Sequence, residues 1–232
     1  EQMAHVEGQV EDELDFWHRE EVAPPLRAQV DQMYVKGLRY LAGSQTKNGN
    51  WPDRNGSEPG VVGLCVMAFL AHGEDPNHGP YAGNIRSGIE FIIENQNETN
   101  GYIGSSMYNH GFATLALAEV YGVLRDDKIA QALQDAVDLI LSAQERNNRG
   151  AWRYTPDSPD ADTTVTGAQM VALYAARNAG IPQPRHREEG GDVHRDRIVP
   201  AVRQTLRVSP RTRPGANARG VGWFTRTPSR ST

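Results

Sequence analysis

The stretch that decides the fold of this chain is KGLRYLAGSQTKNGNW, residues 36–51. It holds the last turns of an apolar stripe with helical spacing, then a glutamine, a turn and a tryptophan. The stripe begins upstream, and its members are Val30, Met33, Tyr34, Gly37, Leu38 and Leu41. Because apolar residues recur three and four positions apart, the spacing predicts an amphipathic helix that ends near Asn48 and Gly49.

The same pattern recurs twice downstream. A shift of 51 positions, and then one of 48, carries the stripe and its glutamine onto two further segments. The aligned residues are Tyr34, Gly37, Leu38, Tyr40, Leu41 and Gln45, then Ile85, Gly88, Ile89, Phe91, Ile92 and Gln96, then Leu133, Ala136, Val137, Leu139, Ile140 and Gln144. Self-similarity at a nearly fixed period indicates stacked supersecondary units.

A second kind of helical segment, apolar on almost every side, follows each amphipathic one. These segments run from Gly63 to Ala71, from Gly111 to Tyr121 and from Gly167 to Ala179. A helix that is apolar all round must be covered on both sides, whereas an amphipathic helix is covered on one. The sequence therefore predicts an all-α fold of about three helical hairpins in two layers, with hairpins at about 30–73, 82–122 and 129–180.

The segment 36–51 resembles the Gln-Trp repeat of squalene and hopene cyclases, which belong to the terpene cyclase and prenyltransferase α/α-toroid superfamily. The second copy has a tyrosine in place of the tryptophan, and the third reaches its tryptophan after a short insertion. The resemblance covers about residues 30–180 and implies a partial α/α-toroid. In that superfamily the motif is structural, and the residues that match it are Gln45, Trp51, Gln96, Tyr102, Gln144 and Trp152.

These residue types suit a contact between consecutive repeats. We call each pair of glutamine and aromatic residue a clip: Gln45 with Trp51, Gln96 with Tyr102, and Gln144 with Trp152. A glutamine amide can satisfy the unpaired N–H groups at the start of the next helix, while an aromatic ring packs over it. The motif therefore supports the fold and says little about catalysis.

The loop before the third apolar segment carries Asp-Ala-Asp-Thr-Thr at 160–164. It resembles the Asp-x-Asp-Asp-Thr acid motif of hopene-type cyclases, with the last aspartate replaced by threonine. The resemblance implies that Asp162 protonates an alkene in an apolar cavity with Asp160 as its helper. A structural interpretation stands beside it, in which both aspartates form turns and the helix is capped by Thr163, Thr164 or Thr166.

Equivalent loops of stacked repeats lie at one end of the array, so we expect loop aromatic residues to gather there. The candidates for contact with an apolar ligand are Trp152, Tyr154, Tyr108 and His110. The aromatic rings could equally close the hairpin ends, and the histidine could be a hydrogen-bonded residue at a helix start. Asp157 and Asp160 also permit the acid and base of an α/α-barrel glycosidase or lyase.

Composition narrows the function classes. A net charge of -5 and a pI near 5.8 argue against a nucleic-acid partner. Cys65 is the single cysteine and lies in an apolar run, so we expect neither a disulfide nor a metal site, and no cofactor. No apolar run approaches the roughly 18 residues of a transmembrane helix, which predicts a soluble protein. The cytoplasm is favoured, although a leader removed before Glu1 would leave the compartment open.

Three regions follow from these patterns. Residues 1–28 form an acidic N-terminal lead with eight acidic side chains, residues 29–182 form the repeat domain, and residues 183–232 form a basic Arg- and Pro-rich segment. Eleven arginines and no lysine fall between 185 and 232, where a fourth repeat should begin. This change fits a disordered basic tail, or an out-of-frame reading of GC-rich DNA, and resequencing the coding DNA separates the two.

Three hairpins form an arc with an open apolar edge, to be completed by the N-terminal lead, another subunit or further repeats. The sequence favours a squalene cyclase- or prenyltransferase-like repeat protein that binds an isoprenoid or other apolar ligand. One alternative is a class II terpene cyclase fragment, an isomerase that acts through Asp162. The other is a helical-repeat scaffold for protein interactions.

Overall fold

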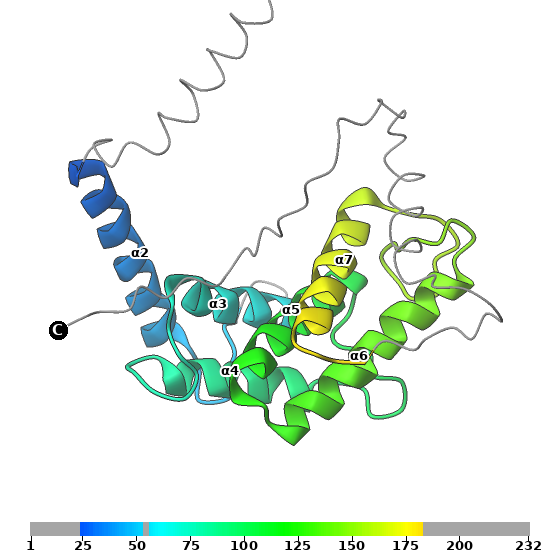
Figure 1. Ribbon diagram of the computed structural model, residues 1–232, viewed down its shortest axis with the longest axis horizontal. Coiled ribbons are helices and arrows are strands. Elements are labelled where there is room, and N and C mark those ends of the chain that lie inside the picture. The colour runs from blue at the N-terminus through cyan, green and yellow to red at the C-terminus, as the bar shows by residue number, and fades with distance from the viewer. Residues whose placement is uncertain (1–23, 53–55, 183–232) are drawn as a thin grey trace, which may run out of the picture. The chain divides into compact units, whose positions relative to one another are not determined.

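The computed structural model describes residues 24–52 and 56–182, with side chains from residue 28 onward. Within this part of the chain, Gln96 and Ile103 form an isolated bridge, and every named element is a helix. The helices are α2 (Pro24–Ser44), α3 (Pro59–His72), α4 (Ala82–Glu94), α5 (Met107–Leu124), α6 (Asp127–Arg146) and α7 (Thr163–Asn178). The prediction of an all-α fold is confirmed for these residues (Figure 1).

Helix α2 belongs to a compact unit of its own, and the chain from Gln45 onward forms a second unit. The helix begins at Pro24, earlier than the predicted start at Val30. Proline fits the first turn of a helix, because the N–H that it lacks has no partner there. The pair of prolines in the expected lead is therefore the start of the helix.

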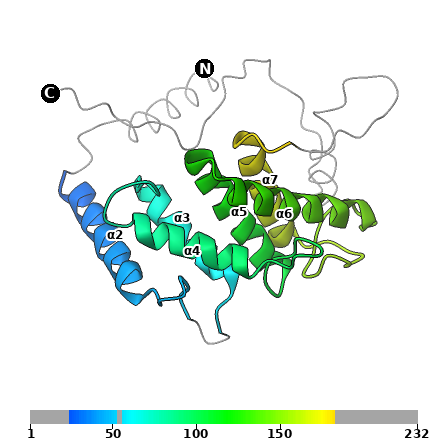
Figure 2. The same cartoon turned by 90° about the horizontal axis from the view of Figure 1, so that it is seen from below.

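The second unit is built in two layers (Figures 1 and 2). Helices α3, α5 and α7 form a row in which each packs against the next, while α4 packs on α3 and α6 packs on α5. The interior of the unit is filled by fully buried apolar side chains from both layers, including Val62, Val66, Phe69, Ile85, Ile92, Leu117, Leu133, Ile140 and Leu173. The predicted division into amphipathic and apolar helices agrees with these pairings.

Glycines allow the helices of the inner row to approach one another closely. A β-carbon at Gly63 of α3 would lie 2.6 Å from the backbone oxygen of Phe112 in α5. A β-carbon at Gly111 of α5 would lie 2.6 Å from Nε2 of Gln169 in α7. A larger residue at Gly63 would meet backbone and push α3 and α5 apart, whereas one at Gly111 would first displace the side chain of Gln169.

The helices of the inner row run parallel. The N–H of Gly60, in the first turn of α3, donates to Oδ1 of Asn109 in the first turn of α5 at 3.1 Å. The hydroxyl of Tyr108 in α5 is hydrogen-bonded to that of Thr164 in the first turn of α7. First turns therefore meet first turns, and the N-terminal ends of all three helices gather at one end of the array.

The inner helices begin about one turn before the glycines that mark them in the sequence. Their N-cap residues are Glu58, Ser106 and Asp162, each with extended backbone. The glycines were predicted as the starts of the helices, but they lie in the second turn, where they make the helix contacts described above. His110, expected ahead of its helix, consequently lies inside α5.

Candidate functional site

The first glutamine clip joins a loop to the next outer helix. Nε2 of Gln45 donates to the carbonyl of Gly49 and to that of Asn84 in α4, both at 2.9 Å. Oε1 of Gln45 accepts a hydrogen bond from Nδ2 of Asn84 at 2.6 Å. The glutamine amide was expected to satisfy N–H groups at the helix start, whereas its Nε2 donates to backbone carbonyls.

The second clip repeats this geometry. Nε2 of Gln96 donates to the carbonyl of Gly101 at 3.0 Å and to that of Ala132 in α6 at 2.9 Å. In the third repeat Nε2 of Gln144 donates to the carbonyl of Gly150 at 2.9 Å. Gly49, Gly101 and Gly150 all adopt positive φ angles, which glycine tolerates best, so each loop turns at the residue that the glutamine binds.

The aromatic members of the clips are packed into the second unit. Trp51 and Trp152 are buried, and Nε1 of Trp152 donates to the carbonyl of Ile140 in α6 at 2.8 Å. The ring of Tyr102, which replaces the tryptophan in the second repeat, lies 5.5 Å from that of His110. Burial raises the pKa of Tyr102 to about 12, and the charge of Glu58 adds to the effect.

His110 is fully buried, and both of its ring nitrogens are bonded to the backbone. Nδ1 accepts from the N–H of Ile103 at 3.1 Å, so Nε2 carries the proton and donates to the carbonyl of Ala136 at 3.0 Å. Burial lowers the pKa of His110 to about 4, although the bond to Ala136 opposes the shift. The imidazole is therefore neutral and ties the loop before α5 to α6, with no ring nitrogen left for a ligand.

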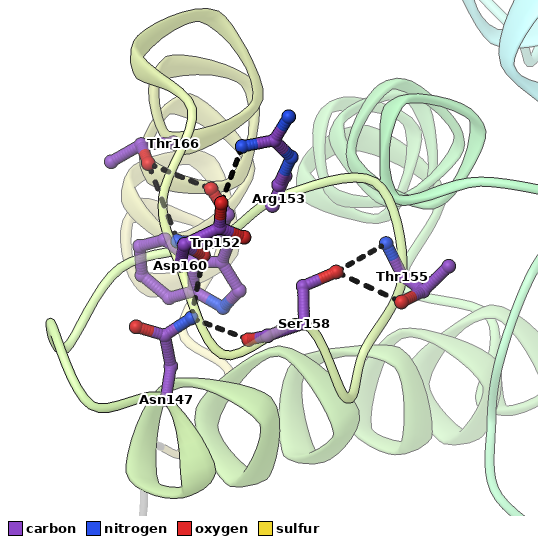
Figure 3. A network of polar contacts seen from close by, with 7 residues as sticks. All are labelled: Asn147, Trp152, Arg153, Thr155, Ser158, Asp160 and Thr166. Carbon is purple, nitrogen blue, oxygen red and sulfur yellow. Dashed lines mark hydrogen bonds and ion pairs between the residues drawn. The ribbon is translucent and has the colours of Figure 1, made fainter.

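The third loop is held against α6 by a network of polar contacts (Figure 3). Nδ2 of Asn147 donates to the carbonyls of Ser158 and Asp160, at 2.7 and 2.8 Å. The Asp160 carboxylate pairs with Arg153 at 2.6 Å. Asp157 forms an ion pair with Arg146 at 3.5 Å, so the two carboxylates considered for a glycosidase each have a cationic partner.

Asp162 is the N-cap of α7, the role that had been considered for the neighbouring threonines. Its Oδ1 accepts from the hydroxyl of Thr164 at 2.6 Å and from the N–H groups of Thr164 and Val165 at 2.9 and 3.0 Å. The hydroxyl bond, followed by the bond from Val165, lowers the pKa of Asp162 below its ordinary value of 3.8. Protonating an alkene needs a strong acid that still holds its proton, whereas this carboxyl is stabilised as the anion.

The cap makes a pH-dependent prediction. Asp162→Asn keeps an N-cap residue but removes its charge, so the variant is expected to be less stable than the wild type at neutral pH. Because the folded-state pKa of Asp162 is lowered, its contribution is present above pH 3.8 and is lost as the pH falls through the folded-state pKa. Urea unfolding at neutral pH and at about pH 3 measures this, and a difference between the two proteins that does not shrink in acid contradicts it.

Tyrosines and a phenylalanine gather near the N-terminal ends of α5 and α7. The ring of Tyr108 lies 6.2 Å from that of Tyr154 and 6.4 Å from that of Phe112. Tyr154 is 46% exposed, and the guanidinium of Arg153 lies 5.0 Å above its ring. The predicted loop aromatics thus separate into a buried residue, Trp152, and an accessible pair, Tyr108 and Tyr154.

One face of α5 leads away from these tyrosines. Tyr108, Phe112, Leu115 and Glu119 follow one another at three- and four-residue spacing, which places them on a single stripe. His110 bonds to α6 from the opposite side of the helix, so the stripe faces away from the outer layer. Sequence reasoning missed Glu119, whose pKa is raised by burial. An acidic residue within an apolar segment was the available signal.

No family model and no curated protein matches this chain.

The described residues show two further features that bear on metal and thiol chemistry. They contain no cluster of three or more side chains that could hold a metal ion, and burial raises the pKa of the Cys65 thiol to about 11. No helix within residues 24–52 and 56–182 has the length and apolar character needed to span a membrane. The stripe of α5 that begins at Tyr108, beside Tyr154, holds the half-buried apolar residues Phe112 and Leu115 and the acidic Glu119.

Proposed function

We propose that this protein is a repeat protein of the α/α-toroid type that binds an isoprenoid or similarly extended apolar ligand. The ligand would lie along α3, α5 and α7, on the faces turned away from α4 and α6. The observation that carries the proposal is the half-buried apolar surface of α5 at Phe112 and Leu115, beside Tyr108 and Tyr154. Apolar side chains left accessible across neighbouring helices are typical of a binding surface.

The position of these residues follows from the helix contacts. A β-carbon at Gly88 of α4 would lie 2.7 Å from Val66 and 3.4 Å from Val62, so those valines face the outer layer. Leu64 stands midway between them in the sequence, which turns it to the opposite side of α3. Leu115 and Val171 lie four residues after Gly111 and Gly167 of their own helices, whereas Leu64 lies one residue after Gly63.

Binding without catalysis is the form of the proposal that the chemistry favours. Asp162 caps a helix as an anion and Asp160 pairs with Arg153, so neither carboxyl resembles the acid that alkene protonation requires. The same proposal includes the arrangement of the hairpins. They would form an arc of a toroid, which a further subunit or further repeats would complete.

A ligand-displacement experiment tests the proposal. Farnesol is titrated into the full-length protein carrying a fluorescent apolar probe, and saturable displacement is expected. Leu115→Asn should weaken farnesol binding about tenfold, because a buried apolar contact is replaced by a polar amide. Leu124→Asn is the matched control, since Leu124 is also a half-buried leucine of α5 but lies outside the stripe, and its affinity should be unchanged.

Two outcomes would contradict ligand binding at this face. One is the absence of saturable displacement by the wild type, which would favour a scaffold without a small-molecule site. The other is an equal loss of affinity in both variants, which would locate the effect in the stability of α5 rather than in contact with farnesol.

A further inference from the structure

The contact between α3 and α5 has a defined register. Gly63 approaches Phe112 and Ala113, the first and second residues after Gly111 of the next helix. A β-carbon at Gly63 would lie 2.6 Å from the oxygen of Phe112 and 3.2 Å from Cα of Ala113. Gly63 therefore lies against the backbone of α5 at the two residues that follow Gly111, the equivalent glycine of that helix.

The contact between α5 and α7 repeats this register. Gly111 approaches Ala168 and Gln169, the first and second residues after Gly167. A β-carbon at Gly111 would lie 3.2 Å from Cβ of Ala168 and 2.6 Å from Nε2 of Gln169. The same register thus occurs twice in succession within one chain, although Gly63 meets backbone atoms and Gly111 meets side-chain atoms. The repeated register indicates which residues a third junction would bring together.

The third glycine faces open space. Gly167 has no atom within 4 Å of the position that a β-carbon would take. On the same side of α7, Val171 is 54% exposed and Tyr174 is 38% exposed. We name Gly167, Val171 and Tyr174 the α7 edge. It presents the glycine surface that α3 and α5 use for stacking, together with exposed apolar side chains.

The other end of the inner row presents the matching half. Leu64 and Cys65 are the first and second residues after Gly63, and by register they correspond to Phe112 and Ala113. Leu64 is 48% exposed. We name Leu64 and Cys65 the α3 edge. In α5 the corresponding residues lie against Gly63 of α3, and in α7 they lie against Gly111 of α5. The α3 edge is therefore the face with which an inner helix contacts the inner helix before it.

We propose that the α7 edge of one copy receives the α3 edge of a second copy of this chain. In the complex, Gly167 lies against Leu64 and Cys65 of the other copy, as Gly63 lies against Phe112 and Ala113. The edge residues themselves are uncharged, and the nearby guanidinium of Arg177 lies 4.8 Å above the ring of Tyr174 at the end of the α7 edge. A junction of two different edges closes into a ring or extends into a chain, depending on the rotation between copies.

The mass of the full-length protein in solution tests the proposal. Light scattering coupled to gel filtration should give at least twice the 25.6 kDa of one chain. Gly167→Leu should weaken association about a hundredfold, because the side chain would occupy the space of the incoming helix. Leu64→Lys should weaken it from the other side, since a lysine there would be desolvated without a partner.

Mixing the two variants distinguishes this junction from a symmetric one. Gly167→Leu leaves the α3 edge intact and Leu64→Lys leaves the α7 edge intact, so the mixture retains one complete junction. A 1:1 complex of two chains is expected to form from variants that are each mainly single chains. If the same edge paired with itself, the mixture would associate no better than its components.

Matched controls keep loss of folding apart from loss of association. Gly122→Leu changes a helical glycine of α5 that also has open space around it, and Val123→Lys changes an apolar residue that is 49% exposed, as Leu64 is 48% exposed. Both should associate like the wild type, and all four variants should keep the helical circular dichroism of the wild type.

A single-chain mass for the wild type at every concentration would overturn the proposal, because it would mean that the edges are free or are covered by the same chain. Equal association of Gly167→Leu and wild type would overturn it as well. The measurement uses no ligand, so it stands or falls separately from farnesol binding.

Discussion

Replacing His110 with alanine is expected to lower the free energy of unfolding by about 3–5 kcal/mol, the range found when large buried rings are truncated. The substitution leaves a cavity at a fully buried site between the two layers. It also removes the imidazole that accepts from the N–H of Ile103 and donates to the backbone carbonyl of Ala136. Buried polar groups that lose a partner add to the loss of packing. Urea denaturation followed by circular dichroism measures the change.

The control for this prediction is His110→Gln. Glutamine has an amide donor and a carbonyl acceptor, so it can replace part of the link between the loop and α6 and should lose less stability than alanine. An alanine variant that loses under about 1 kcal/mol would mean that water or a local rearrangement satisfies both backbone groups.

His110 also makes the free energy of unfolding depend on pH. With a folded-state pKa of about 4 against an ordinary value of 6.5, His110 binds its proton more readily in the unfolded chain. Stability from the neutral ring is therefore fully present above pH 6.5 and is lost as the pH falls toward 4, by an amount on the order of 3 kcal/mol. His110→Gln should remove this part of the acid sensitivity, and an unchanged pH profile would contradict the assignment.

The second large effect is expected at Gly101. Its φ of +73° favours glycine, and a β-carbon there would lie 2.6 Å from the backbone carbon of Asp135 in α6. Gly101→Ala therefore combines left-handed strain with a clash that only a shift of α6 relieves. A loss of at least about 3 kcal/mol in the free energy of unfolding is expected.

Gly73→Ala separates the two contributions. Gly73 ends α3 with a φ of +94° and has nothing within 4 Å of its β-carbon position. Its replacement should cost only the strain of the left-handed backbone, about 1–2 kcal/mol. Urea unfolding of both variants gives the comparison, and equal losses would show that the approach of Gly101 to α6 contributes nothing.

The helices were predictable because each leaves a strong periodic signal. The stripe that begins at Val30 and its two copies repeat at nearly constant spacing, and a stripe at that spacing can be buried only as a helix. The apolar segments were placed in an inner layer for the same reason, and their pairing with α4 and α6 agrees with that assignment. In α4 and α6 the predicted stripes are largely buried, whereas in α2 Val30 and Met33 are 52% and 72% exposed, so the stripe there predicted the helix without a covered face.

The details of the loops could not be derived in the same way. Asp-Ala-Asp-Thr-Thr at 160–164 offers several residues that can cap a helix, and only the backbone geometry selects Asp162. The glutamine amide can donate or accept, so its composition did not reveal that Nε2 binds the carbonyls of Gly49 and Asn84. Side-chain hydrogen bonds depend on positions that periodicity does not fix.

The alignment of the repeats indicates the environment of His110. The shifts that align Gly63, Gly111 and Gly167 place His110 opposite Val62 and Thr166, both of which are buried. A histidine at a position occupied by a buried valine in another repeat is expected to be neutral and internally bonded. As a single histidine beside a loop, His110 resembles a ligand-binding group, and only the aligned positions indicate that it is buried.

The three clips differ in one respect that bears on how such a chain can change over time. The glutamine binds a glycine carbonyl four residues away in the first repeat, five in the second and six in the third, and every bond is 2.9 to 3.0 Å long. A loop can therefore gain residues while the layers stay as they are, because the glycine turn absorbs the added length. Sequence variation is free to accumulate at the end where Tyr108 and Tyr154 lie, and the helices that support this end need not change with it.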